Sequence, residues 1–255
     1  MRADTASGAS RIYDSAVLPG HVSTSTRPIL ATVPLVPPDS LLRIRADIDA
    51  RQAAQLDALA FSANVVDFLY RRLAAFLLSA GVTRPIVAEE VLADAWAIVD
   101  WVHRLDGLVR HLRGVPKGSV VVQEYLNATS LVETQRHRIQ HLEGTIPAIE
   151  ASGRSAFGHL CWTLDGGPTD DGGREQIIVC ALSSMRGKGE EAWRLPELLP
   201  PRGPIDHISL FSADGEAELG LTGQVEALTR FIGFLEAAVA SAVDPGANGI
   251  LVIPI

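Results

Sequence analysis

A short basic stretch at residues 136–141, with the sequence RHRIQH, carries the side-chain types that phosphodiester cleavage requires. A guanidinium such as that of Arg136 binds a phosphate through charge-assisted hydrogen bonds, and an imidazole such as that of His141 moves a proton near neutral pH. Glu133 precedes His137 by about one helical turn, close enough to orient an imidazole or pair with an arginine. These residues are the minimum equipment for RNA cleavage, with Arg136 and His141 as candidate catalytic residues, His137 and Glu133 in support, and no cofactor expected.

Three long helices are expected to position this stretch, because apolar residues recur at three- and four-residue spacings in three segments. The helices are predicted over residues 49–80 with a stop at Gly81, from an N-cap at Thr83 to a stop at Gly114, and from about Ser119 to a disturbance at Pro147. Long amphipathic helices joined by short loops predict an antiparallel bundle, which we place at residues 39–152.

The hydrophobic period changes to that of strands in the last part of the chain, residues 153–255. Strands are predicted at AFGHLCWTL, REQIIVCALSS, IDHISLF and AELGLT, and a closing helix at QVEALTRFIGFLEAAVASAV. The first two strands flank a Gly- and Asp-rich turn and form a predicted hairpin. Residues 1–38, rich in Ser, Thr, Ala and Pro, predict an extended, weakly ordered arm. The expected fold class is α+β: a bundle of three long helices, then a small, mostly antiparallel sheet and a C-terminal helix.

Composition limits the partners that the chain is expected to bind. Its 255 residues carry a formal net charge of -8, so contact with RNA must be confined to a local basic patch. No segment approaches the run of about 20 apolar residues that a membrane span needs, and no signal peptide is evident, so a cytoplasmic protein with no membrane association is predicted. Cys161 and Cys180, on consecutive predicted strands, are expected to be reduced core residues.

The spacing of Arg136, His137 and His141 on the last long helix of a bundle resembles the motif of the HEPN superfamily of helical-bundle proteins. The resemblance covers roughly residues 50–150 and leaves the sheet region unassigned. It implies metal-independent RNA cleavage, linked to defence or stress, at a cleft between two protomers of a homodimer. It also implies that Arg136 holds the scissile phosphate, that His141 acts as general base or acid, and that His137 tunes the pair.

Helical geometry adds a condition to this hypothesis. Positions five apart on a regular helix point about 140° away from one another, so Arg136 and His141 need a distorted turn, long side chains or a second protomer in order to meet. The second predicted helix offers His103 as a supporting residue, because it lies near the middle of an antiparallel neighbour. Arg104 and His111, on the same helix, repeat the motif with a longer spacing.

Other interpretations of the same residues remain open. The basic stretch also fits a solvated, charged stripe on an amphipathic helix. His137 and His141, four residues apart, have the spacing of a helical metal-ligand pair that His103 would complete. The alternative function is a non-catalytic module, in which the bundle dimerises and the sheet or the apolar C-terminal GILVIPI binds a protein partner.

Overall fold

The computed structural model shows an α+β protein in which helices and a sheet share one hydrophobic core. It describes residues 33–44, 48–79, 87–152, 155–168, 175–183, 205–212 and 217–241. The helices are α1 (Leu41–Ile44), α2 (Ala50–Ser79), α3 (Ala88–His111), α4 (Val120–Ala128), α5 (Val132–Gln140), α6 (Leu142–Ser152) and α7 (Leu221–Ser241). The strands are β1 (His159–Pro168), β2 (Glu175–Ser183), β3 (Ile205–Phe211) and β4 (Glu218–Gly220).

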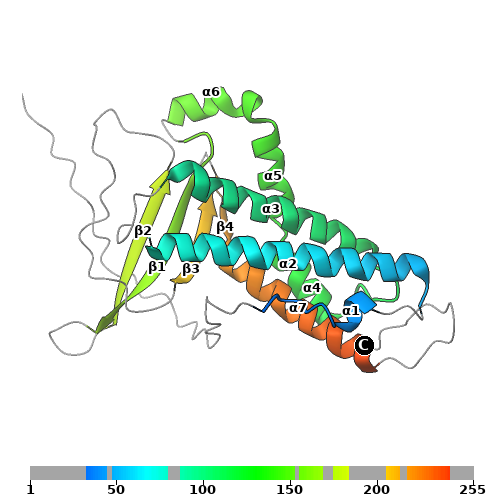
Figure 1. Cartoon of the computed structure of the whole chain (residues 1–255). Helices are drawn as coiled ribbons and strands as arrows, with labels where there is room; N and C mark the ends of the chain where they lie inside the picture. The colour runs from blue at the N-terminus through cyan, green and yellow to red at the C-terminus, as the bar shows by residue number, and fades with distance from the viewer. Residues whose placement is uncertain are drawn as a thin grey trace, which may run out of the picture.

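The two longest helices, α2 and α3, pack side by side and run in opposite directions (Figure 1). Both helices contribute fully buried residues to the core, among them Leu59 and Leu73 of α2 and Ile98 and Leu105 of α3. Both predicted helices are thus confirmed over their described lengths, and α3 ends before Gly114, whose φ of 74° suits glycine. The predicted stop at Gly81 and cap at Thr83 lie outside the described residues.

The prediction of one long third helix is wrong, because the segment forms α4, α5 and α6 with a change of direction between them. The first break comes at Thr129 and Ser130, two residues whose hydroxyl groups compete with the helix for backbone hydrogen bonds. The buried Thr129 hydroxyl donates to the carbonyl oxygen of Tyr125 at 3.0 Å, in addition to the Thr129 amide at 3.1 Å, a local contact that competes with continuation of the helix. The second break is at His141, whose φ of -110° and ψ of 38° are not helical.

The strands form an antiparallel sheet in the order β2-β1-β3-β4. The predicted hairpin is confirmed, because β1 pairs with β2 over Trp162 opposite Cys180. Trp162 and Ile208 are fully buried and face each other on β1 and β3, so one side of the sheet belongs to the core. Cys161 has a free thiol and lies opposite Ala181 in the strand register. Because side chains alternate along a strand, Cys161 points to the other side of the sheet from Trp162.

Helix α7 joins the sheet to the helices, because it starts directly after β4 and contacts α1, α2, α4 and β3. Thr222, in its first turn, accepts a hydrogen bond from the Ile208 amide at 2.8 Å, and its hydroxyl lies 2.9 Å from that of Tyr70 on α2. Phe231 stacks on Tyr125 of α4 with ring centroids 5.1 Å apart. The C-terminal helix is therefore a member of the bundle as well as the end of the sheet region.

Part of the predicted arm is well packed. Within residues 33–38, Leu35 and Val36 are buried, and Asn64 of α2 binds both the amide and the carbonyl of Val36, at 2.7 and 2.8 Å. This portion is held against α2, because the Asn64 side chain satisfies both backbone groups of Val36. None of the described helices combines the length and apolar character of a membrane span.

Candidate functional site

Asp100 of α3 brings the predicted catalytic arginine together with a second arginine. Its Oδ1 accepts a hydrogen bond from Arg136 Nε at 2.7 Å, and its Oδ2 accepts one from Arg104 Nε at 2.9 Å. Arg136 Nη1 also donates to Gln140 Oε1 at 3.1 Å. Two guanidinium groups therefore share one carboxylate, which leaves a surplus positive charge where α3 meets α5.

The arrangement determines how Asp100 titrates. Burial alone would raise the pKa of this carboxyl group, but the hydrogen bonds from Arg136 and Arg104 outweigh burial and lower it below its usual value. Asp100 is thus ionised at neutral pH and can hold both arginines. The side chain of Arg136 is 27% exposed and that of Arg104 is 56% exposed, so the positive charge remains accessible to an anion.

The two predicted histidines of α5 lie in contact. The rings of His137 and His141 have centroids 4.3 Å apart and planes at 54°, and both residues are exposed. His141 sits at the break between α5 and α6, so the regular helical geometry that would point it about 140° from Arg136 does not apply. The structure thus meets one of the conditions of the hypothesis, a distorted turn.

The two remaining candidate residues have different surroundings. His103 is half-buried and, within the described part of the chain, forms no hydrogen bond, ion pair or ring contact. Glu133, in the first turn of α5, acts on Asp106 of α3, because its charge adds to the burial that raises the pKa of that carboxyl group to about 6. Within the described part of the chain, neither residue forms a hydrogen bond or ion pair with His137 or His141.

Asp106 belongs to a buried polar cluster beneath the start of α5. Asp106 is 9% exposed, and Tyr125 and Gln135 are 1% and 2% exposed. Among the described residues, Asp106 Oδ1, the Tyr125 hydroxyl and Gln135 Nε2 are buried without a hydrogen bond of standard geometry, although the side chains of Thr129 and Tyr125 lie close enough to Asp106 to oppose part of the rise in its pKa. Sequence reasoning missed this cluster, because an acid at one position of an amphipathic pattern looks like any other polar residue.

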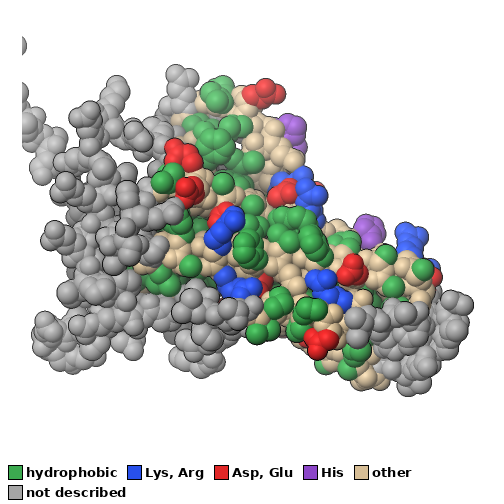
Figure 2. Space-filling view, in the orientation of Figure 1, with side chains coloured by type: hydrophobic (Ala, Val, Ile, Leu, Met, Phe, Trp, Pro, Cys, Tyr) green, Lys and Arg blue, Asp and Glu red, His purple; other side chains and the backbone are tan. Residues whose placement is uncertain are grey.

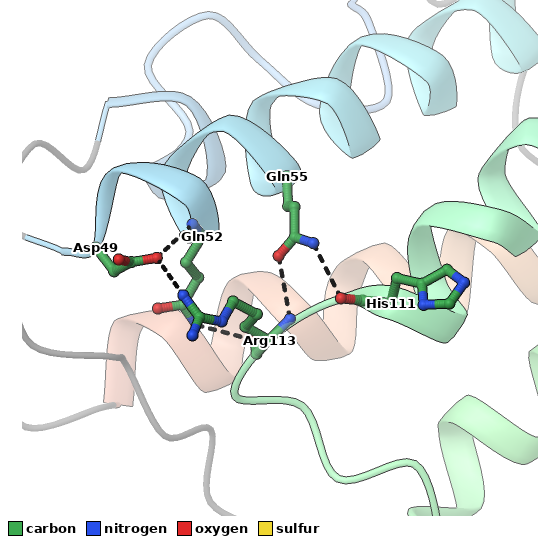
Figure 3. Close-up of polar contacts among 5 residues, drawn as sticks. All are labelled: Asp49, Gln52, Gln55, His111 and Arg113. Atoms are coloured by element: carbon green, nitrogen blue, oxygen red, sulfur yellow. Dashed lines mark hydrogen bonds and ion pairs between the residues drawn. The ribbon is translucent and has the colours of Figure 1, made fainter.

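The C-terminal end of α3, at His111 and Arg113, has a structural role (Figure 3). Gln55 of α2 accepts a hydrogen bond from the Arg113 amide at 3.2 Å and donates one to the carbonyl oxygen of His111 at 2.9 Å. The Arg113 side chain binds Asp49 at 2.9 Å, and its carbonyl oxygen accepts from Gln52 at 2.9 Å. Arg104 and His111, which repeat the motif with a longer spacing, are thus separated. Arg104 joins the Asp100 cluster, whereas the backbone of His111 is held by the first turns of α2.

The sheet also carries a Ser-His-Glu arrangement that the sequence did not reveal. The Ser209 hydroxyl lies 2.7 Å from His207 Nε2 and 2.5 Å from Glu218 Oε1. These are the residue types of a hydrolytic triad, but Ser209 is 1% exposed and its hydroxyl contacts both partners at once. The contacts therefore join β3 to β4 and leave no accessible nucleophile.

The metal-binding alternative is not assembled in the described residues, where no three His, Cys, Asp or Glu side chains are grouped so that they could hold an ion. Asp100 is the residue that sequence reasoning missed at the main cluster. Its spacing of four from Arg104 was a detectable signal for an ion pair on one helix, but its contact with Arg136 depends on packing between α3 and α5.

The chain matches no model of a protein family, no curated protein and no solved structure. What the fold and the site define is an α+β protein whose helical part carries a two-arginine cluster beside a pair of exposed histidines.

Proposed function

We propose that the region where α3 meets α5 cleaves RNA without a metal ion, as the motif resemblance implied. The observation that carries this proposal is the shared use of Asp100 by Arg136 and Arg104, which leaves positive charge beside the exposed His137 and His141. A phosphodiester needs a cationic group for its phosphate and an imidazole for its protons, and both kinds of group occur here.

The proposed reaction assigns one step to each group. His141 accepts the proton of a ribose 2′-hydroxyl, and the 2′ oxygen forms a bond to phosphorus as the bond from phosphorus to the 5′ oxygen breaks. The departing 5′ oxygen takes a proton from His137, so the products are a 2′,3′-cyclic phosphate and a 5′-hydroxyl. Arg136 and Arg104 stabilise the negative charge that builds up on the phosphoryl oxygens.

Cleavage of labelled single-stranded and structured RNA in the presence of EDTA tests the proposal. The wild type should cut, whereas Arg136→Ala and His141→Ala should lose cleavage by about 100-fold or more while remaining folded. His111→Ala is the matched control, because His111 is also an exposed histidine but lies at the far end of α3, and its contact with Gln55 uses the backbone. Equal activity in all four proteins, or no cleavage by any, would reject the enzyme.

A second candidate function is a non-catalytic interaction module. It is favoured by two exposed aromatic residues on α2, Phe61 at 53% and Phe68 at 55%, the second of which has the guanidinium of the Asp94-paired Arg72 beside its ring. Exposed aromatic groups within a charged rim are typical of protein interfaces. If this function is correct, Arg136→Ala and His141→Ala should alter assembly or partner binding and reveal no lost cleavage.

A further inference from the structure

A continuous series of side-chain contacts leads from α2 across α3 to Arg136. The ring of Phe61 meets that of Trp101 edge to face, with centroids 5.8 Å apart at 62°. The Arg104 guanidinium lies over the Trp101 ring at 5.3 Å, and Asp100 then links Arg104 to Arg136. We call these five residues the aromatic-arginine strip.

The outer part of the strip is open to solvent. Phe61 is 53% exposed although its neighbours Ala60 and Ser62 are buried, so this ring contributes little to the core. On the face shown in Figure 2, hydrophobic side chains gather over α2 and α3 with basic and acidic side chains among them. An aromatic ring that is held by a neighbouring indole, and still exposed, offers a surface on which another flat group can stack.

The charges along the strip favour a nucleic acid over a protein as the occupant. The chain as a whole is acidic, at a formal net charge of -8, yet this strip carries two guanidinium groups for one carboxylate. Phosphates would meet the cationic end at Arg104 and Arg136, and bases would meet the aromatic end. An arginine over an aromatic ring is also a common partner for a stacked base.

We propose that the strip binds an unpaired RNA strand, with one or more bases stacked on Phe61 and Trp101 and the adjoining phosphates held by Arg104 and Arg136. Bases in a duplex are stacked on one another and cannot reach such a surface, so the strip selects single strands. The inference rests on the proposed function, because the same two arginines serve the proposed cleavage. It adds the form of the substrate and the residues that recognise it.

The chain supplies a close control for Phe61. Phe68, seven residues further along α2, is 55% exposed and has the Arg72 guanidinium 5.3 Å from its ring. Arg72, however, is paired one-to-one with Asp94, whose Oδ2 accepts from Arg72 Nε at 2.8 Å. Among the described residues, this second aromatic-arginine pair therefore has one carboxylate for its one guanidinium group, and none of its side-chain contacts leads to Arg136.

Fluorescence anisotropy with a labelled oligouridylate of about 12 nucleotides measures the binding, in EDTA and with His141→Ala as the background so that the probe stays intact. Phe61→Ala should raise Kd by roughly 5-fold or more, whereas Phe68→Ala should change it less than about 2-fold. A duplex of the same length should bind roughly 10-fold more weakly than the single strand. Thermal denaturation checks that each variant is folded.

Three results would overturn the inference: equal losses in the two phenylalanine variants, equal binding of duplex and single strand, or no detectable binding of the oligouridylate. If Phe61→Ala instead abolishes self-association and leaves RNA binding unchanged, the occupant is a second copy of the chain. Binding that depends on Phe61, together with no cleavage by the wild type, would support the strip and reject the ribonuclease. The two proposals can thus fail separately.

Discussion

Arg136 on α5 is bound to Asp100 on α3, with its Nε 2.7 Å from Asp100 Oδ1. This contact joins the predicted catalytic arginine to a residue that lies 36 positions earlier in the chain. Because Asp100 also binds Arg104, the three residues form one charged cluster. The cluster fixes where the two guanidinium groups lie before any ligand arrives, which is the preorganisation that phosphate recognition needs.

Replacing this shared carboxylate should cost stability. Asp100→Asn removes the negative charge that both arginines bind, and the groups are partly exposed, so the free energy of unfolding should fall by about 1 kcal/mol at neutral pH. The folded-state pKa of Asp100 is lowered, so its contribution is present above 3.8 and is lost as the pH falls below that value. Urea denaturation of both proteins at neutral and acidic pH should show the difference narrowing in acid. A constant difference at every pH would contradict this account.

Asp106 should have the opposite pH dependence. Burial raises the pKa of this carboxyl group from 3.8 to about 6, so the folded state binds a proton more readily than the unfolded state. Stability should therefore fall as the pH rises from about 4 to about 6, by on the order of 3 kcal/mol, and remain level above that. Asp106→Asn cannot ionise and should be more stable than the wild type at neutral pH. Urea denaturation across this range measures the effect, and Asp57→Asn, at a side chain that is 60% exposed, should leave the pH dependence unchanged.

Gln55 should matter more than its partly exposed position indicates. Gln55→Ala loses hydrogen bonds to both the Arg113 amide and the His111 carbonyl oxygen, which close the C-terminal end of α3 on α2 (Figure 3). The expected loss is about 1–2 kcal/mol in the free energy of unfolding. Gln123→Ala is the control, because its amide makes one exposed hydrogen bond to the Lys117 carbonyl oxygen. A loss in Gln55→Ala no larger than that in the control would refute the role of Gln55.

Gly158 should not tolerate a side chain. Its φ is 74°, and a Cβ atom there would lie 2.0 Å from the carbonyl oxygen of Phe211 on the neighbouring strand β3. Gly158→Ala should therefore lower the free energy of unfolding by about 2–3 kcal/mol or prevent folding. Gly107→Ala, inside α3 one turn before its last residue and with no atom within 4 Å of the added group, should raise stability by up to about 1 kcal/mol. Thermal denaturation of the pair checks both signs, and equal effects would show that the close approach at Gly158 is unimportant.

Local sequence determined most of the secondary structure, because hydrophobic period and helix-ending residues act within a few positions. The periodicity was sufficient to predict α2, α3, the hairpin of β1 and β2, strand β3 and helix α7. It failed at the third helix because apolar spacing continued through Thr129, whose hydroxyl bonds back to the carbonyl oxygen of Tyr125 at the point where α4 ends.

Side-chain types by themselves were also enough to predict Arg136 and His141 as candidate catalytic residues, since a guanidinium and an imidazole have the same chemistry wherever they lie. What surrounds them was decided by the tertiary structure alone. The contact of Arg136 with Asp100 and the raised pKa of Asp106 each depend on residues from different helices, whereas the pairing of Arg104 with Asp100 follows from their spacing of four on α3. No spacing rule along one chain segment encodes which faces of two helices pack together, because that choice depends on how the whole hydrophobic core is filled.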